Sequence, residues 1–202
     1  MENSLYNPYV TEQIHHVNSN VAGICYSVPY LHSTRSTQDN PNILNTRNII
    51  SLHNQLANEA TLMIIPFEEI RLQGMIKVPQ AYSHLKNSRV RLGINYFSLK
   101  AHYAALLELS NDFSFWLYDF APPGADWRVM DSFPLSGIVL NESFFNENYQ
   151  KFTFPFFMAS FRERDAEVIV RSHEPRLSTE QLAALNITGW QQQRSEGELL
   201  EI

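Results

Sequence analysis

The sequence predicts an α+β fold that is mainly β: an antiparallel, sandwich-like domain with one long helix, one short helix and an extended N-terminal arm. Short apolar and aromatic segments recur between prolines and polar turns, which is typical of strands. Two segments carry a clear helical signature, and residues 1–45 repeat too few apolar side chains to build a core. We therefore divide the 202 residues into an arm (1–45), a globular β-rich domain (46–190) and a polar C-terminal tail (191–202).

The long helix is expected to begin at Thr46, whose hydroxyl can cap it, because Ile49, Leu52, Leu56 and Ala60 follow at helical spacing. The strands after it are expected where β-branched or aromatic residues meet proline or turn boundaries. These segments are 61–67, 68–79, 90–96, 113–120, 127–133, 137–141, 151–161 and 166–172.

The short helix is predicted after Ser178, which forms a capping box with Gln181. Segment 97–109, FSLKAHYAALLEL, fits two structures and lies in the densest apolar block of the chain, 88–120. Its alanines and leucines favour a helix. Read as a strand, it would place His102 and Glu108 on one face. The sequence leaves both possibilities open.

Composition narrows the classes of function. The net charge of −6 argues against a general nucleic-acid binder, which needs a basic face. Cys25 is the single cysteine, so no intrachain disulfide is expected. The N-terminus lacks the pattern of a signal peptide, and no segment approaches the roughly 18 consecutive apolar residues of a membrane span. We expect cytoplasmic synthesis and no insertion into a membrane.

One catalytic hypothesis joins Cys25, His102 and Asp119. A thiolate nucleophile needs an imidazole to take its proton and a third group to orient that imidazole. The segment HYAALLELSNDFSFWLYD places a histidine and an aspartate at the two ends of a possible hairpin. In this layout it resembles the papain-like peptidases and amidases, whose residues come in the order Cys, His, Asp or Asn. That resemblance implies a cysteine peptidase or amidase, although Pro29 disfavours the helix that such a cysteine opens.

No metal site and no cofactor are expected. His15 and His16 are adjacent and so point in different directions, and the other histidines are scattered singly. The chain contains none of the glycine-rich or serine motifs of nucleotide enzymes and hydrolases.

The aromatic residues predict a binding surface. Phe154, Phe156 and Phe157 lie in a segment whose two faces both carry rings, and Trp116 and Trp127 are further candidates for binding. A third hypothesis is a small-ligand or sugar binder that uses Trp116, Trp127 and Tyr118. The leading hypothesis is a non-catalytic structural or adaptor protein, a subunit of a multi-protein assembly of the virion or secretion-apparatus type. Its expected partners are other protein subunits, of the same or a different chain, including a possible homo-oligomer.

Overall fold

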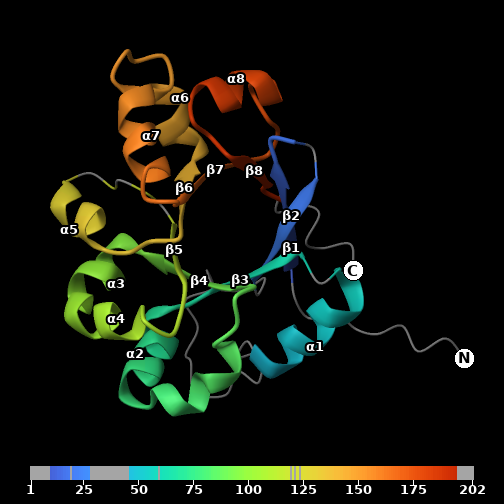
Figure 1. The fold of residues 1–202 in the computed structure, drawn as a ribbon, viewed down its shortest axis with the longest axis vertical. Coiled ribbons are helices and arrows are strands. Elements are labelled where there is room, and N and C mark those ends of the chain that lie inside the picture. Colours follow the sequence, from blue (N-terminus) through green and yellow to red (C-terminus); the bar gives the residue numbers. More distant parts are fainter. Residues whose placement is uncertain are drawn as a thin grey trace, which may run out of the picture.

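Eight strands close into a barrel, and helices surround it on the outside (Figure 1). The computed structural model describes residues 10–18, 20–27, 46–58, 60–118, 120, 122 and 124–194. The strands are β1 (Val10–His16), β2 (Val21–Ser27), β3 (Leu62–Pro66), β4 (Val90–Asn95), β5 (Phe115–Tyr118), β6 (Gly137–Asn141), β7 (Glu167–Ser172) and β8 (Gly189–Gln192). The helices are α1 (Thr46–Leu56), α2 (Glu69–Lys77), α3 (Tyr96–Ala101), α4 (Tyr103–Leu109), α5 (Trp127–Ser132), α6 (Glu142–Asn148), α7 (Phe154–Arg162) and α8 (Thr179–Ala184), with a 3₁₀ helix η1 (Pro79–Leu85).

The barrel contains one strand that runs against the others. Strands β2 to β8 pair in parallel, each with the next. Strand β1 is antiparallel to both of its neighbours, β2 and β8, and so closes the barrel. A tight turn makes this possible, since the amide of His16 donates to the carbonyl of Asn20 over 2.9 Å and returns the chain directly into β2.

The strands are apolar because both of their faces are buried. Leu92 and Ile94 of β4 belong to the large core cluster between the barrel and the helices. A second cluster is built entirely from strand residues of successive strands, which places it inside the barrel: Ile14, Cys25, Ile64, Trp116, Val139 and Ile169. This inner and outer packing is typical of a parallel β/α barrel.

The prediction of an antiparallel sandwich with an extended arm is therefore wrong. The strand positions at 61–67, 90–96, 113–120, 137–141 and 166–172 hold, but their pairing is parallel and closed. Residues 10–16 and 21–27, expected in the arm, form β1 and β2 and complete the barrel. The physical reason is that burial on both faces gives near-continuous apolar runs, whose partners and direction no local pattern specifies. The boundaries near residues 45 and 190 stay predictions, although β8 runs across the second.

Three predicted strands are helices. Segment 68–79 forms α2, with Leu72 and Met75 buried three residues apart. Segment 127–133 forms α5, whose first turn is capped by Asp126. Segment 151–161 contributes α7, with Pro155 in the first turn, where its missing N–H costs nothing. Segment 97–109 is helical, as α3 and α4. The alternation of Phe152, Phe154 and Phe156 had led to the incorrect prediction of a strand over 151–161.

The two predicted helices are confirmed, although the Thr46 hydroxyl lies 2.6 Å from Nε2 of His84. Helix α1 begins at Thr46, and α8 follows Ser178, which makes both hydrogen bonds of the capping box with Gln181. Within the described ranges, the longest helix, α1, has 11 residues. None of the described helices combines the length and the apolar character that crossing a membrane requires.

Candidate functional site

The functional residues of β/α barrels lie at the carboxyl-terminal ends of the parallel strands. We therefore expect a site at this end of the barrel, which we call the mouth. Parallel strands contribute Cys25, Tyr118, Arg171 and Gln191 to this end. Since β1 runs in the opposite direction, its early residue Glu12 reaches the same end and pairs in register with Cys25. These five side chains form one hydrogen-bonded layer, which we call the mouth network.

An ion pair occupies the centre of the mouth network. The Nε and Nη2 groups of Arg171 donate to the two carboxylate oxygens of Glu12 over 2.8 and 2.7 Å. The amide of Gln191 donates to Oε2 of Glu12 over 2.7 Å. Burial alone acts to lower the pKa of Arg171, but its bonds to Glu12 raise that pKa above the ordinary value. The two-point contact fixes the orientation of both side chains.

Neutral groups continue the network across the barrel. The Tyr118 hydroxyl donates to Oε1 of Gln191 over 3.0 Å and lies 3.5 Å from the sulfur of Cys25. Burial raises the pKa of the Cys25 thiol to about 12 and raises the pKa of Tyr118 above its usual value. Because the thiolate is the reactive form, Cys25 in this setting is a poor nucleophile near neutral pH.

The structure does not bring Cys25 and His102 together. Cys25 lies inside the barrel, whereas His102 lies between α3 and α4 in the outer helical layer (Figure 1). The Nε2 atom of His102 is 2.6 Å from Oε1 of Glu69, and the hydroxyl of Ser98 donates to the other oxygen over 2.7 Å. The third predicted member, Asp119, lies outside the described residues. His102 therefore serves as a link between α2 and the α3–α4 junction.

The predicted binding aromatics separate into three environments. Trp116 is fully buried inside the barrel, and Phe154 is buried in the core. Phe156 is 70% exposed. Trp127 and Phe157 contact each other with ring centroids 4.5 Å apart, and with Phe154 they line a pocket between α5, α6 and α7. This pocket lies in the helical layer and is distinct from the mouth network.

Sequence reasoning singled out Cys25 and Tyr118 separately but missed the mouth network that joins them. Glu12 and Arg171 are 159 positions apart, and only barrel closure brings them together. One available signal was that Glu12 and Arg171 each lie within a strand-like segment, VTEQIHH and EVIVRS. A charge at a buried strand position requires a partner, but its identity depends on the topology.

No family model matches the chain, and no curated protein matches it. Solved structures do match the chain in fold. An EAL-domain protein from Listeria monocytogenes is 14% identical, with a TM-score of 0.66 over 96% of this chain and 91% of that one. The PaMucR phosphodiesterase in complex with c-di-GMP is 13% identical, with a TM-score of 0.62 over 92% and 89%. Bacillus subtilis YkuI, which has an EAL domain and was solved with the substrate c-di-GMP and calcium, is 10% identical, with a TM-score of 0.64 over 91% and 53%.

These likenesses show that the chain has the barrel fold of EAL domains. They overturn the prediction of a non-catalytic structural or adaptor protein in a multi-protein assembly, because one neighbour is named as a phosphodiesterase and another was solved with c-di-GMP as its substrate. The assembly hypothesis rested on an unpaired arm and surplus aromatic surface. Residues 10–16 and 21–27 of that arm are barrel strands, and Phe154 and Trp116 of the predicted aromatic surface are buried in the core.

The calcium of one neighbour raises the question of whether this mouth could hold a hard cation. Calcium takes six to eight oxygen ligands, several of them from carboxylates. Glu12 is the one carboxylate of the mouth network, and both of its oxygens already accept hydrogen bonds from Arg171 and Gln191. Among the described residues no group of three or more His, Cys, Asp or Glu side chains could hold a metal. The mouth network therefore does not fit calcium.

Proposed function

We propose that this protein is a signalling protein that binds the cyclic dinucleotide c-di-GMP at the carboxyl-terminal mouth of its barrel. The observation that carries the proposal is the shared barrel, which extends over 92% and 91% of this chain in two structures that contain c-di-GMP. Ligands of β/α barrels bind at this end irrespective of the chemistry performed there. The mouth network supplies the polar groups for such a ligand.

Arg171 is the residue best suited to meet the phosphodiester groups. Two of its guanidinium nitrogens contact Glu12, and within the described part of the mouth Nη1 has no such bond to that carboxylate. The Arg171 side chain is 34% exposed, whereas Glu12 beneath it is 8% exposed. A planar, exposed guanidinium held from below by a carboxylate is preorganised to donate to phosphate oxygens.

Hydrolysis of c-di-GMP is the second candidate function. It is supported by the neighbour named as a phosphodiesterase and by the one solved with c-di-GMP as substrate. The mouth network supplies one carboxylate, which is already paired with Arg171, so we derive no metal-dependent step from it.

The test is a calorimetric titration of the full chain with c-di-GMP. The mouth variant carries Arg171→Met together with Glu12→Gln, because removing one partner alone would leave a buried charge unpaired. Lys100→Gln, an exposed charge on α3, is the matched control. We expect the mouth variant to bind at least about tenfold more weakly, which corresponds to the loss of one charge-assisted contact. Circular dichroism confirms that each variant is folded.

Two results would decide against the proposal: no binding by the wild-type chain, or equal binding by the wild type and the mouth variant. A parallel assay for the linear dinucleotide product, with and without added calcium, separates the two candidate functions. Turnover would establish hydrolysis, and binding without product would establish a receptor.

A further inference from the structure

A pocket of about 540 Å³ lies between α5, α6 and α7, in the helical layer outside the barrel. Its walls are mainly aromatic, from Trp127, Phe144, Phe157 and Phe161, and its rim carries Arg128 and Lys151. This volume is within the usual range for small-molecule sites, which are apolar clefts with a few polar groups that orient the ligand. The inference drawn from it is independent of the proposed binding at the mouth.

One buried ring, that of Phe120, packs against all four aromatic wall residues and holds them in place. Phe120 is fully buried and contacts each of the four wall residues, with ring centroids 5.1 to 5.6 Å apart. Most of these contacts are edge-to-face, which is the preferred geometry of aromatic pairs. The walls are therefore formed before any ligand arrives, and binding needs little ordering of side chains.

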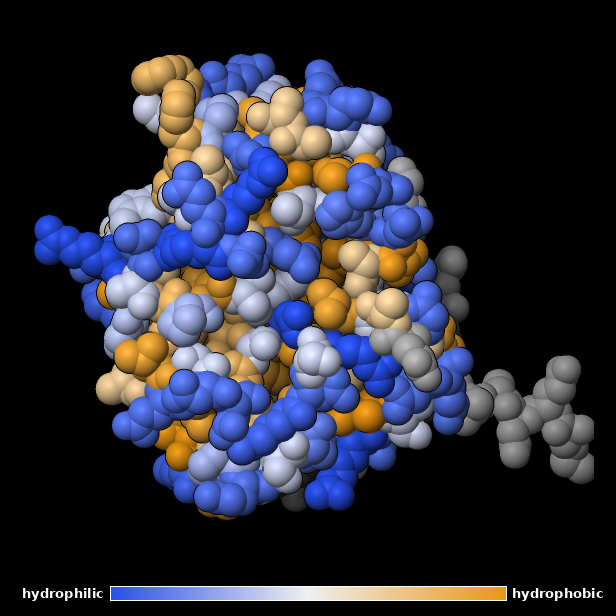
Figure 2. Space-filling model, in the orientation of Figure 1, coloured by the Kyte–Doolittle hydropathy of each residue, from blue (hydrophilic) through white to orange (hydrophobic). Residues whose placement is uncertain are grey.

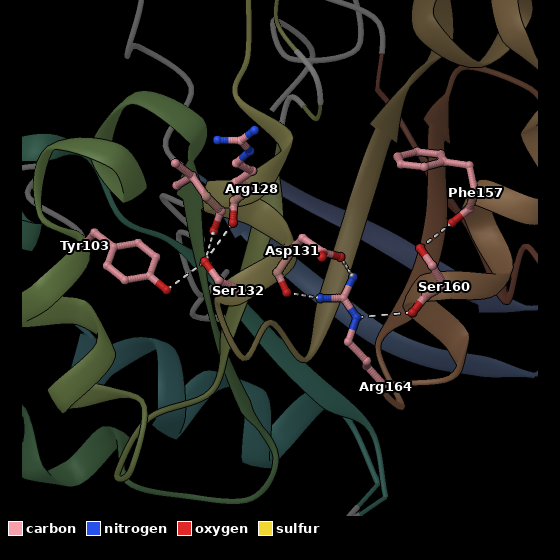
Figure 3. A network of polar contacts seen from close by, with 8 residues as sticks. Tyr103, Arg128, Asp131, Ser132, Phe157, Ser160 and Arg164 are labelled. Atoms are coloured by element: carbon pink, nitrogen blue, oxygen red, sulfur yellow. Dashed lines mark hydrogen bonds and ion pairs between the residues drawn. The ribbon is translucent and has the colours of Figure 1, made fainter.

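A polar network ties α5, which forms one side of the pocket, to the elements on both sides of it (Figure 3). Arg164 forms an ion pair with the Asp131 carboxylate at 3.0 Å, and its Nε group donates to the carbonyl of Ser160 in α7 over 3.1 Å. On the other side, the Tyr103 hydroxyl of α4 donates to Oγ of Ser132 over 2.9 Å. These bonds keep α5 at its distance from α7 and so maintain the width of the pocket.

The same network leaves the rim of the pocket positively charged. The one carboxylate of the lining, Asp131, is balanced by Arg164. The Arg128 guanidinium projects away from the network in Figure 3, and within the described part of the chain no ion pair joins it to a carboxylate. Lys151 donates to Oδ1 of Asn148 over 2.8 Å, which is a neutral partner. On a protein whose net charge is −6, two uncompensated cations at an aromatic pocket indicate an anionic ligand.

We propose that this pocket binds a small molecule that combines a flat aromatic ring system with one anionic group such as a carboxylate, sulfonate or phosphate. The rings lie against Trp127 and Phe157. The anionic group reaches the rim, where Arg128 and Lys151 donate to it. The aromatic walls favour the ring system, and the two cations at the rim favour a ligand with an anionic group over a neutral apolar one.

The test compares two dyes with the same ring system in fluorescence titrations of the full chain. Anilinonaphthalene sulfonate carries the anionic group, and phenylnaphthylamine lacks it. We expect the sulfonate dye to bind the wild type about tenfold more tightly, as one charge-assisted contact allows. The double variant Arg128→Gln with Lys151→Gln changes only exposed side chains, so it should fold normally. It should bind both dyes equally.

The matched control is Phe152→Ser. Phe152 is 81% exposed and packs against Phe156 with ring centroids 5.8 Å apart, outside the pocket. Apolar side chains project from the surface over the connection between α6 and α7, where a dye could bind without entering the pocket (Figure 2). Loss of dye binding in Phe152→Ser, equal binding of both dyes by the wild type, or an unchanged preference in the double variant would each overturn the proposal.

Discussion

Gly137 of β6 should not tolerate a side chain, because the indole of Trp116 occupies the space beside it. The two residues are partners in the β5–β6 ladder. A Cβ on residue 137 would lie 2.5 Å from Nε1 and 2.7 Å from Cδ2 of Trp116, well below van der Waals contact. Trp116 is fully buried inside the barrel and is surrounded by strand residues, so the ring has little room to move.

The expected cost of Gly137→Ala is about 2 kcal/mol of unfolding free energy, the middle of the range for overpacked cores. For a chain of this size that corresponds to a fall of roughly 4–8 °C in Tm. The measurement is urea denaturation followed by circular dichroism. Gly74→Ala in α2 is the control, because its nearest neighbour is the Tyr82 hydroxyl at 3.1 Å and alanine favours a helix. It should leave stability unchanged or raise it by up to about 1 kcal/mol.

A double-mutant cycle with Trp116→Leu identifies the cause. Removing the indole makes space for the new methyl group, so the double variant should be more stable than the sum of the single effects predicts, by about 1 kcal/mol or more. The reasoning is refuted if Gly137→Ala has wild-type stability within about 0.5 kcal/mol, the range of ordinary surface changes. It also fails if the two substitutions are additive.

Three further predictions concern titratable groups. Hydrogen bonds from His102 and Ser98 lower the pKa of Glu69 to about 2, so its contribution to stability should be lost as the pH falls from about 4.5 toward 2, and Glu69→Gln should flatten that part of the stability curve measured by denaturation. Burial lowers the pKa of His53, which accepts from Tyr26, so stability should fall as the pH drops below about 6.5, and less so in His53→Gln. Burial raises the pKa of Cys25, so a thiol reagent should label the native chain slowly and the urea-unfolded chain fast; equal rates would contradict the buried position.

Local signals in the sequence predicted the parts of the fold that depend on neighbouring residues. Thr46 and Ser178 marked two helix starts correctly, and Ser178 caps its helix as predicted. Five strand segments were also placed correctly. These features depend on short-range hydrogen bonds and on burial, which a sequence pattern reports directly.

The closure of the barrel and the direction of its strands could not be predicted in this way. Ile14 pairs with Gln191 across almost the whole chain, and no local pattern encodes that contact. Phe152, Phe154 and Phe156 alternate like a strand, yet Phe154, Met158 and Phe161 form the buried face of a helix. The spacing of these three phenylalanines does not distinguish a strand from a helix, and the tertiary packing determines that the segment is helical.

The candidate site was missed for the same physical reason. Cys25 was singled out for its chemistry, but the partner expected from its order in the chain, His102, lies in the helical layer. Its actual neighbour is Tyr118, 93 positions away on a strand inside the barrel. Contacts between strands of a barrel are set by topology, so the residues of the mouth can be recognised only once the barrel is known.

Hydrogen exchange of the full chain, with and without c-di-GMP, tests the central claim most directly because it reports where the dinucleotide binds. We expect slower exchange at the carboxyl-terminal ends of β5, β7 and β8, around Tyr118, Arg171 and Gln191, and unchanged exchange in α5 and α7. No change anywhere, or slowing confined to the pocket between α5, α6 and α7, would contradict binding at the barrel mouth.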